Sequence, residues 1–244
     1  MIVMQRLYKK WFSKCLQKDM EILVFGFAGT PVILFPTRTA HFYDYEDWKI
    51  IDAIKDKINS GQLHIFCVDS NDIESFYSHD PAPEKIKKHL QYEQYILKEV
   101  LPFIRSCNKN KSITAAGCSL GGYHAVNLAF KHPGHFSKVV GMSSRYDLTL
   151  SSGKFPDLLN GVVNEDVYFN MPSMFIPNLT DKSILRLLKK MKIIFAIGKE
   201  DPFFENNVQL YNALLDKNIH PEIYIWDDEA HRPRHWRQMV KLYL

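Results

Sequence analysis

Short apolar runs recur along the chain and are separated by Gly, Asp, Ser or Pro. The runs are rich in Val, Ile, Leu and Phe, and they occupy 21–27, 31–35, 63–68, 112–116, 138–142, 192–197 and 222–226. Because nearly every side chain in a run is apolar, each run fits a β-strand that is buried on both faces. The pattern therefore predicts a central sheet with helices on each side.

Segments with apolar residues three or four positions apart lie between these runs. In 46–58, the side chains with the spacing of one helix face are Trp48, Ile51, Ile54 and Ile58. The same periodicity occurs in 83–107, 121–131, 181–189, 206–217 and 233–244. Alternating strands and helices predict an α/β fold with a mostly parallel sheet. Only residues 28–30 separate the first two runs, too few for a helical crossover, so we expect those runs to form an antiparallel N-terminal hairpin.

Residues 146–180 interrupt this alternation. The segment contains several Gly, Pro and Asn residues together with aromatic side chains, among them Tyr168 and Phe169. A long irregular insert in a compact domain is typically a lid or a binding loop. We therefore expect a lid-like insert at about 146–180, with Tyr168 and Phe169 as candidate substrate-binding residues, inside a single domain that spans 1–244.

The most informative motif lies in the turn after the run at 112–116. Gly117-x-Ser119-x-Gly121 follows a predicted strand and precedes a predicted helix, which is the form of a nucleophile elbow. In such a turn the serine is held on a strained bend, and its neighbours must be small so that strand and helix can approach each other. Ser119 is therefore predicted to be a catalytic nucleophile. The alternative is a glycine-rich turn that only saves space.

A serine hydroxyl is a weak nucleophile at neutral pH, so it needs a base and a group that orients the base. In an elbow of this kind the acid and then the histidine follow the serine along the chain. Asp201 comes just after the run at 192–197, and His231 comes just after the run at 222–226. The order and the positions predict a triad of Ser119, Asp201 and His231.

Other residues compete for two of these roles. Glu200 is adjacent to Asp201, and Asp147 follows an earlier predicted strand. His235 competes with His231, although it falls inside the helix that is predicted to begin at Pro233.

Two backbone N–H groups are expected to stabilise the oxyanion that forms when the serine attacks. One belongs to Leu120, the residue after the serine, and the other comes from the loop after the run at 31–35. Pro36 has no N–H, so the second donor is Thr37, Arg38 or Thr39. The Arg38 side chain is either a solvated charge or a contact for an acidic substrate.

Composition and charge restrict the class of protein. The 244 residues are 46% hydrophobic and 24% charged, as in ordinary globular domains. Lys and Arg total 31 against 27 Asp and Glu, and the net charge of +4 is too small to indicate a nucleic-acid partner. Basic residues interrupt the first 18 positions, and no apolar stretch approaches about 18 residues. We expect a cytoplasmic protein without a nucleic-acid or membrane partner. Both a monomer and a homo-oligomer are compatible with the sequence, so the oligomeric state stays open.

No cofactor or metal is expected. The chain has no glycine-rich loop that fits a phosphate or dinucleotide signature. Asp227, Asp228, His231 and His235 are close enough in sequence to suggest a zinc site. Pro233 disfavours a continuous helix between the two histidines, and a His-Glu-x-x-His motif is absent. The four cysteines are scattered, without a Cys-x-x-Cys pair.

The motifs together resemble a known family. Gly117-Cys-Ser-Leu-Gly-Gly122 and Gly198-Lys-Glu-Asp-Pro202, with His231 followed five residues later by Trp236, are similar to segments of the putative esterase family. This family belongs to the α/β-hydrolase superfamily and includes S-formylglutathione hydrolases, feruloyl esterases and mycolyltransferases. The resemblance runs nearly from end to end, and it implies an α/β-hydrolase fold with Ser119, Asp201 and His231 as the triad.

The resulting expectation is a serine hydrolase that cleaves small-molecule carboxylic esters through an acyl-enzyme. An acyltransferase or a thioesterase would use the same triad, and a non-catalytic binding protein with this fold is the alternative outside enzymes. Sequence patterns do not separate the enzymatic alternatives.

Overall fold

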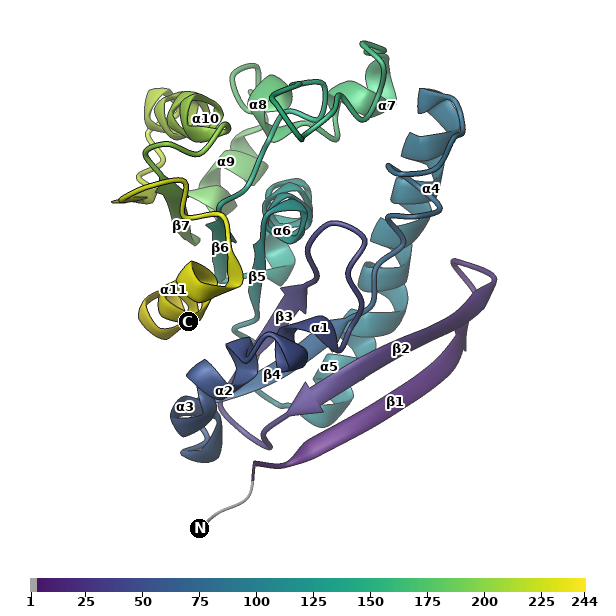
Figure 1. The fold of residues 1–244 in the computed structure, drawn as a ribbon, viewed down its shortest axis with the longest axis vertical. Helices are drawn as coiled ribbons and strands as arrows, with labels where there is room; N and C mark the ends of the chain where they lie inside the picture. Colours follow the sequence, from purple (N-terminus) through teal and green to yellow (C-terminus); the bar gives the residue numbers. More distant parts are fainter. Residues whose placement is uncertain (1–3) are drawn as a thin grey trace.

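An eight-stranded mixed sheet forms the centre of the computed structural model, which describes residues 4–244 (Figure 1). Its strands are β1 (Arg6–Ser13), β2 (Lys18–Phe25), β3 (Thr30–Phe35), β4 (Leu63–Val68), β5 (Thr114–Cys118), β6 (Lys138–Met142), β7 (Lys192–Gly198) and β8 (Glu222–Trp226). They lie in the order β1-β2-β4-β3-β5-β6-β7-β8. The β1–β2 and β2–β4 pairs are antiparallel, and the remaining pairs are parallel. The predicted α/β fold with a mostly parallel sheet is confirmed.

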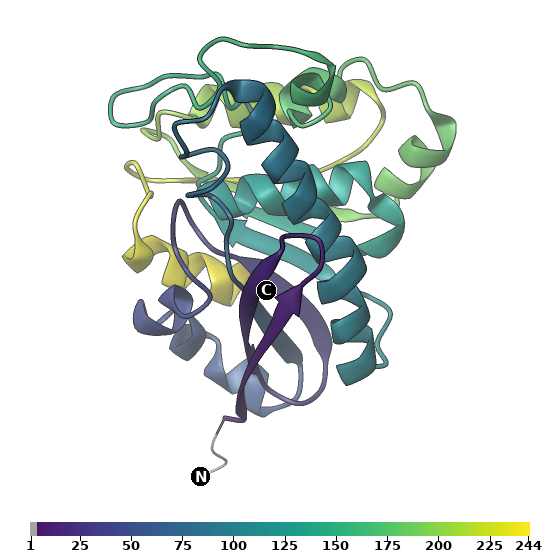
Figure 2. The same ribbon diagram turned by 90° about the vertical axis from the view of Figure 1, so that its right-hand side faces the viewer.

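Helices cover both faces of this sheet (Figure 2). One face is covered by α4 (Ala82–Tyr95), the π-helical turn Ile96–Val100, α5 (Leu101–Cys107), α6 (Leu120–Lys131), α9 (Lys182–Leu188) and α10 (Phe204–Asp216). The other is covered by α1 (Asp44–Asp47), α2 (Ile50–Ala53), α3 (Lys55–Asn59) and α11 (Pro233–Tyr243). A short 3-10 helix, Pro133–His135, follows α6.

The alternation of side chains along the strands explains why both faces are apolar. In β3, Ile33 and Phe35 pack in one buried cluster, whereas Val32 and Leu34 pack in the other. Neighbouring side chains of a strand point to opposite faces, so a continuous apolar run supplies both clusters at once. Of the residues that the structure describes, none lies in a helix long and apolar enough to cross a bilayer.

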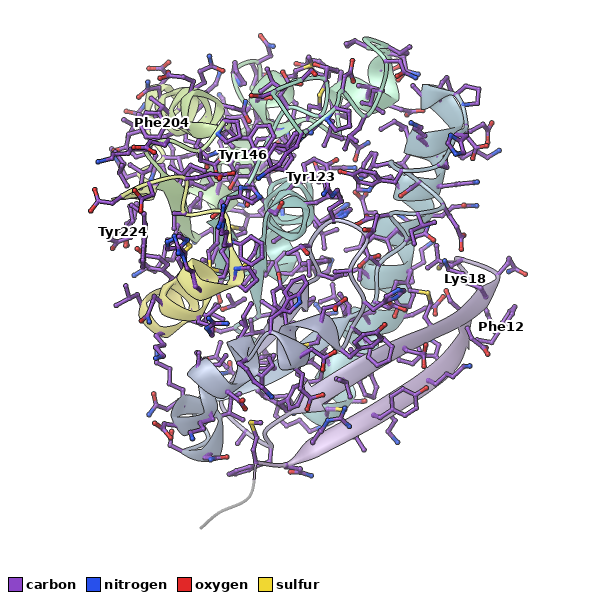
Figure 3. The ribbon with its side chains drawn as sticks, viewed as in Figure 1. Phe12, Lys18, Tyr123, Tyr146, Phe204 and Tyr224 are labelled. Carbon is purple, nitrogen blue, oxygen red and sulfur yellow. The ribbon has the colours of Figure 1, made fainter. Side chains whose placement is uncertain are left out.

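The sheet has N-terminal antiparallel strands, but their pairing differs from the expected one. The run at 21–27 falls largely in β2, which pairs with β1 and β4, so it is not a neighbour of β3. The expected hairpin between 21–27 and 31–35 is therefore wrong, and the hairpin consists of β1 and β2. Figure 3 labels Phe12 and Lys18 near the tip of this hairpin.

Strand β1 is missing from the expected set because its apolar residues are interrupted by charges. Its sequence is RLYKKWFS, and most of its side chains are exposed. Exposed lysines are typical of an edge strand, because they discourage pairing with another chain. The pattern of a doubly buried strand therefore does not apply to it.

The segment 146–180 packs against the helices rather than standing free. It contains two single-turn helices, α7 (Glu165–Tyr168) and α8 (Pro172–Phe175), which contact α4 and α6 respectively. Leu148, Leu159 and Met171 are buried in an apolar cluster with residues of α4 and α6. In Figure 1 the segment lies above α6, and Figure 3 shows Tyr146 in the interior between α6 and α10.

Candidate active site

Ser119 lies in a tight turn between β5 and α6. Its backbone has φ 55° and ψ −124°, a conformation that side-chain-bearing residues rarely adopt. The Ser119 N–H donates to the Met142 carbonyl of β6 at 2.8 Å, which ties the turn to the neighbouring strand. The strained serine between a strand and a helix has the local geometry predicted from the motif.

The glycines on either side of Ser119 are required by close backbone contacts. A Cβ atom on Gly117 would lie 2.3 Å from the carbonyl carbon of Gly121. A Cβ atom on Gly121 would lie 2.2 Å from the Phe35 carbonyl oxygen and 2.5 Å from that of Pro36. The turn after β5 is thus pressed against the end of β3, and only glycine allows this approach.

Two hydrogen bonds connect Ser119, His231 and Asp201. The Oγ atom of Ser119 lies 2.9 Å from Nε2 of His231, and Nδ1 of His231 lies 2.7 Å from Oδ2 of Asp201. The Asp201 side chain is fully buried, and that of His231 is 6% exposed. The other Asp201 oxygen accepts the Phe203 N–H at 2.9 Å, which fixes the carboxylate. With the proton on Nδ1, the imidazole donates to Asp201, and its Nε2 is free to accept from the serine hydroxyl.

All three side chains lie just beyond the ends of parallel strands. Ser119 follows β5, Asp201 follows β7, and His231 lies in the loop between β8 and α11. A Cβ atom on Gly198, at the end of β7, would lie 2.3 Å from the Glu229 carbonyl oxygen. The loop that carries His231 therefore passes directly over the end of β7, which brings the imidazole to Asp201.

The competing residues do not take these positions. Glu200 is exposed, and Asp147 accepts hydrogen bonds from the backbone and hydroxyl of Thr149. His235 lines a cavity of about 190 Å³ that also borders His231, but its Nδ1 atom is buried without a partner among the described residues. Burial, and to a lesser degree the charge of Arg234, lowers the pKa of His235.

The loop expected to hold the second oxyanion donor lies against the serine turn. Gly121, in the first turn of α6, lies so close to the backbone of Phe35 and Pro36 that an added Cβ would collide with it. Residues 37–39 follow directly, so this loop begins beside the N-terminus of α6. Thr39 N–H donates to Oδ2 of Asp72 at 3.3 Å. For Leu120, Thr37 and Arg38, the N–H groups form no hydrogen bond with the described part of the chain.

Comparison with known proteins identifies the family of this chain. Residues 36–226 match the model of the family described as "Putative esterase". The chain belongs to the putative esterase family. It is 25% identical over 250 residues to an acetyl esterase from Caldicellulosiruptor saccharolyticus, which covers 93% of this chain and 85% of that protein.

Solved structures show the same fold at lower identity. A ferulic acid esterase superimposes with a TM-score of 0.78 at 17% identity, covering 98% of this chain and 96% of the other. An S-formylglutathione hydrolase (FrmB) from Staphylococcus aureus gives a TM-score of 0.71 at 17% identity, covering 98% and 97%. This family member therefore has the α/β-hydrolase fold, as the motifs predicted.

Phe155, in the insert, lies beside His231, and the sequence did not single it out. Its ring centroid is 5.1 Å from that of His231 and 4.9 Å from that of Phe203. The Arg38 guanidinium lies 6.0 Å from the Phe155 ring and 5.9 Å from the Tyr77 ring. Burial raises the pKa of Tyr77, and the charge of Arg38 acts in the opposite direction. Aromatic residues are common in the insert, so nothing in the pattern distinguishes Phe155 from its neighbours.

Tyr168 and Phe169, the expected substrate-binding residues, line a different cavity. This cavity has a volume of about 510 Å³, and it also borders Phe130 and Lys131 at the carboxyl end of α6. Ser119 precedes the other end of this helix, about 16 Å away at 1.5 Å per residue. The structure thus does not bring Tyr168 and Phe169 together with Ser119 and His231, and their contact with substrate stays a prediction.

Asp227, Asp228, His231 and His235 are the residues whose spacing suggested a zinc site. Within residues 4–244, no group of three or more His, Cys, Asp or Glu side chains is arranged to hold a metal ion. His231, which the zinc hypothesis needed, is hydrogen-bonded on both ring nitrogens.

Proposed function

We propose that this esterase hydrolyses carboxylic esters with Ser119 as the nucleophile, His231 as the general base and Asp201 as the group that orients the imidazole. The observation that carries the proposal is the unbroken pair of hydrogen bonds, 2.9 and 2.7 Å long, from Ser119 through His231 to Asp201. Membership of an esterase family supports the reaction class. The strained conformation of Ser119 supports its role, because nucleophile elbows share this feature.

In the acylation step, Oγ of Ser119 attacks the carbonyl carbon of the ester while Nε2 of His231 takes the hydroxyl proton. The carbonyl π electrons move to the oxygen, which becomes an oxyanion. Asp201 stabilises the imidazolium that forms. The tetrahedral intermediate then expels the alcohol, which receives the proton from His231, and an acyl-serine remains.

The oxyanion is stabilised by two backbone N–H groups. Leu120 supplies one, and Thr37 or Arg38 supplies the other, because the Thr39 N–H already donates to Asp72. Loss of one such donor typically lowers kcat roughly 10²- to 10³-fold.

In the deacylation step, His231 takes a proton from water, whose oxygen attacks the acyl carbon and displaces Ser119. The serine regains its proton from the imidazolium, and a carboxylic acid is released. The same residues therefore serve both halves of the reaction.

We further propose that the acyl group is small and that the insert at 146–180 forms a lid over one side of the site. The relative from Caldicellulosiruptor saccharolyticus is an acetyl esterase, which supports a short acyl chain. Phe155 contributes an aromatic wall next to His231, and Lys154 ties the insert to the histidine loop through a 3.0 Å ion pair with Glu229. The lid is therefore held next to the proposed base.

Substitution of the serine tests the proposal. Ser119→Ala should lower kcat for p-nitrophenyl acetate roughly 10⁴-fold or more and abolish labelling by a fluorophosphonate. Ser112→Ala is the matched control, because Ser112 is exposed on the loop before β5. The control should keep both activity and labelling. Full hydrolysis by a folded Ser119→Ala variant would refute the assignment.

A further inference from the structure

A buried carboxylate–imidazole pair lies beside the serine turn, outside the proposed triad. Oδ1 of Asp72 is 2.9 Å from Nε2 of His124, and their side chains are 1% and 3% exposed. His124 lies on α6, five residues after Ser119, and Asp72 lies in the loop after β4. The pair therefore connects the helix that begins at the proposed nucleophile to a separate loop.

The second oxygen of Asp72 extends this connection to the loop after β3. Oδ2 of Asp72 accepts the Thr39 N–H at 3.3 Å. Thr39 has a φ of +53°, a left-handed conformation that is unfavourable for a β-branched residue. The surrounding contacts must therefore hold Thr39 in place, and Asp72 provides one of them.

The imidazole of His124 is itself fixed by the rings around it. The ring centroids of Phe35, Phe76 and Tyr92 lie 6.2, 6.0 and 5.4 Å away. Phe35 is the last residue of β3, so the same ring packing reaches the start of the loop that contains Thr37 and Arg38. A side chain held in this way gives Asp72 a rigid anchor on α6.

We propose that Asp72 and His124 are positioning residues for the oxyanion site. They hold residues 37–39 in register with the Leu120 N–H, so that both donors face the oxygen of the substrate carbonyl. The inference rests on the proposed function. A buried ion pair typically adds little stability compared with apolar residues of the same size. Stability alone therefore does not account for this pair, which joins the two segments that supply the oxyanion donors.

The test compares kcat, KM and inhibitor binding in purified variants. Asp72→Ala removes both hydrogen bonds, and Asp72→Asn keeps an oxygen for Thr39 N–H and an amide for His124. We expect Asp72→Ala to lower kcat for p-nitrophenyl acetate roughly 10- to 100-fold with KM changed less than about threefold, because a displacement of about 1 Å costs up to about 10² in rate. Asp72→Asn should restore much of the lost kcat.

A transition-state analogue distinguishes positioning from general destabilisation. A trifluoromethyl ketone adds to the serine and forms an oxyanion, so its inhibition constant for Asp72→Ala should rise in parallel with the loss of kcat/KM. Glu93→Gln is the matched control, because Glu93 forms a buried pair with Lys131 at the opposite end of the same helix. This control should lower the melting temperature while kcat stays within about twofold of the wild type.

The outcomes separate this inference from the proposed function. If the wild type is active and Asp72→Ala keeps its kcat and inhibitor affinity, the inference is overturned and the triad proposal stands. If the wild type neither hydrolyses the ester nor reacts with a fluorophosphonate, both are overturned. If Asp72→Ala does not fold, His124→Leu, which cannot form a hydrogen bond with Asp72, is measured in its place, and an unchanged kcat in that variant also overturns the inference.

Discussion

Replacing Gly121 by alanine tests how closely the serine turn and the oxyanion loop are coupled. The added Cβ would lie 2.2 Å from the Phe35 carbonyl oxygen and 2.5 Å from that of Pro36. Ordinary contacts of a Cβ atom begin near 3.4 Å, so relief requires a separation of α6 from the end of β3 by about 1 Å. Both obstructing atoms belong to the backbone, and no side chain can rotate away to make room.

This separation of α6 from the end of β3 should lower both the stability and the reaction rate. Overpacking of this kind costs about 1–3 kcal/mol of unfolding free energy. The same movement carries residues 37–39 away from the Leu120 N–H, and a misplacement of about 1 Å lowers the rate by roughly 10². We therefore expect Gly121→Ala to lose about 100-fold in kcat for p-nitrophenyl acetate and to melt several degrees lower.

The assay combines steady-state kinetics with thermal unfolding. Gly134→Ala is the matched control, because a Cβ atom there would meet no atom within 4 Å. It should leave kcat and the melting temperature unchanged. A Gly121→Ala enzyme with wild-type kcat would show that the end of β3 moves without affecting the reacting groups, and the coupling between the serine turn and the oxyanion loop would be refuted.

Two further predictions concern charged residues. Burial acts to raise the pKa of Glu93, but hydrogen bonds from His132 and Lys131 outweigh it and lower the pKa from 4.5 to about 2. A carboxylate whose pKa is lower in the folded than in the unfolded state stabilises the fold fully above pH 4.5, and this contribution is lost as the pH falls toward 2. Between pH 7 and pH 3, the free energy of unfolding should fall by roughly 2 kcal/mol from this group alone. In urea unfolding, Glu93→Gln should therefore differ from the wild type far more at pH 7 than at pH 3, and an equal difference at both would contradict the reasoning. Asp201→Asn should lower kcat about 10³- to 10⁴-fold without loss of fold, because the amide favours the wrong imidazole tautomer; an activity within tenfold of the wild type would exclude Asp201 as the orienting group.

Most of the fold was predictable because its signal is local. Strands β3 to β7 are buried on both faces, so each appears as an apolar run in the sequence. Strand β8 also coincides with an apolar run, although its side chains are partly exposed. The pairing of β2 was not predictable in this way. The three residues 28–30 between two apolar runs suggested that β2 pairs with β3. In the sheet, β4 lies between β2 and β3, and β1 pairs with the other side of β2. Which strands become neighbours depends on packing across the whole sheet, and the spacing along the chain does not encode it.

The residues of the candidate site likewise differ in whether the sequence carries a local signal for them. Ser119, Asp201 and His231 each follow an apolar run, and parallel strands place such positions at one edge of a sheet. Asp72 and Phe155 have no comparable signal, because one lies in an irregular loop and the other in the aromatic-rich insert. Their contacts with His124 and His231 depend on how these segments fold back.

The placement of the insert suggests how substrate preference and chemistry are separated in this esterase. The proposed triad and the Leu120 N–H come from the ends of β5, β7 and β8, whose backbones are fixed by the sheet. The insert reaches this region through Lys154 and Phe155, and no hydrogen bond joins it to the Ser119, Asp201 or His231 side chains within the described chain. Changes in 146–180 can therefore reshape the wall beside His231 while the reacting groups keep their geometry. The oxyanion loop lacks this freedom, because Gly121 and Asp72 tie it directly to α6.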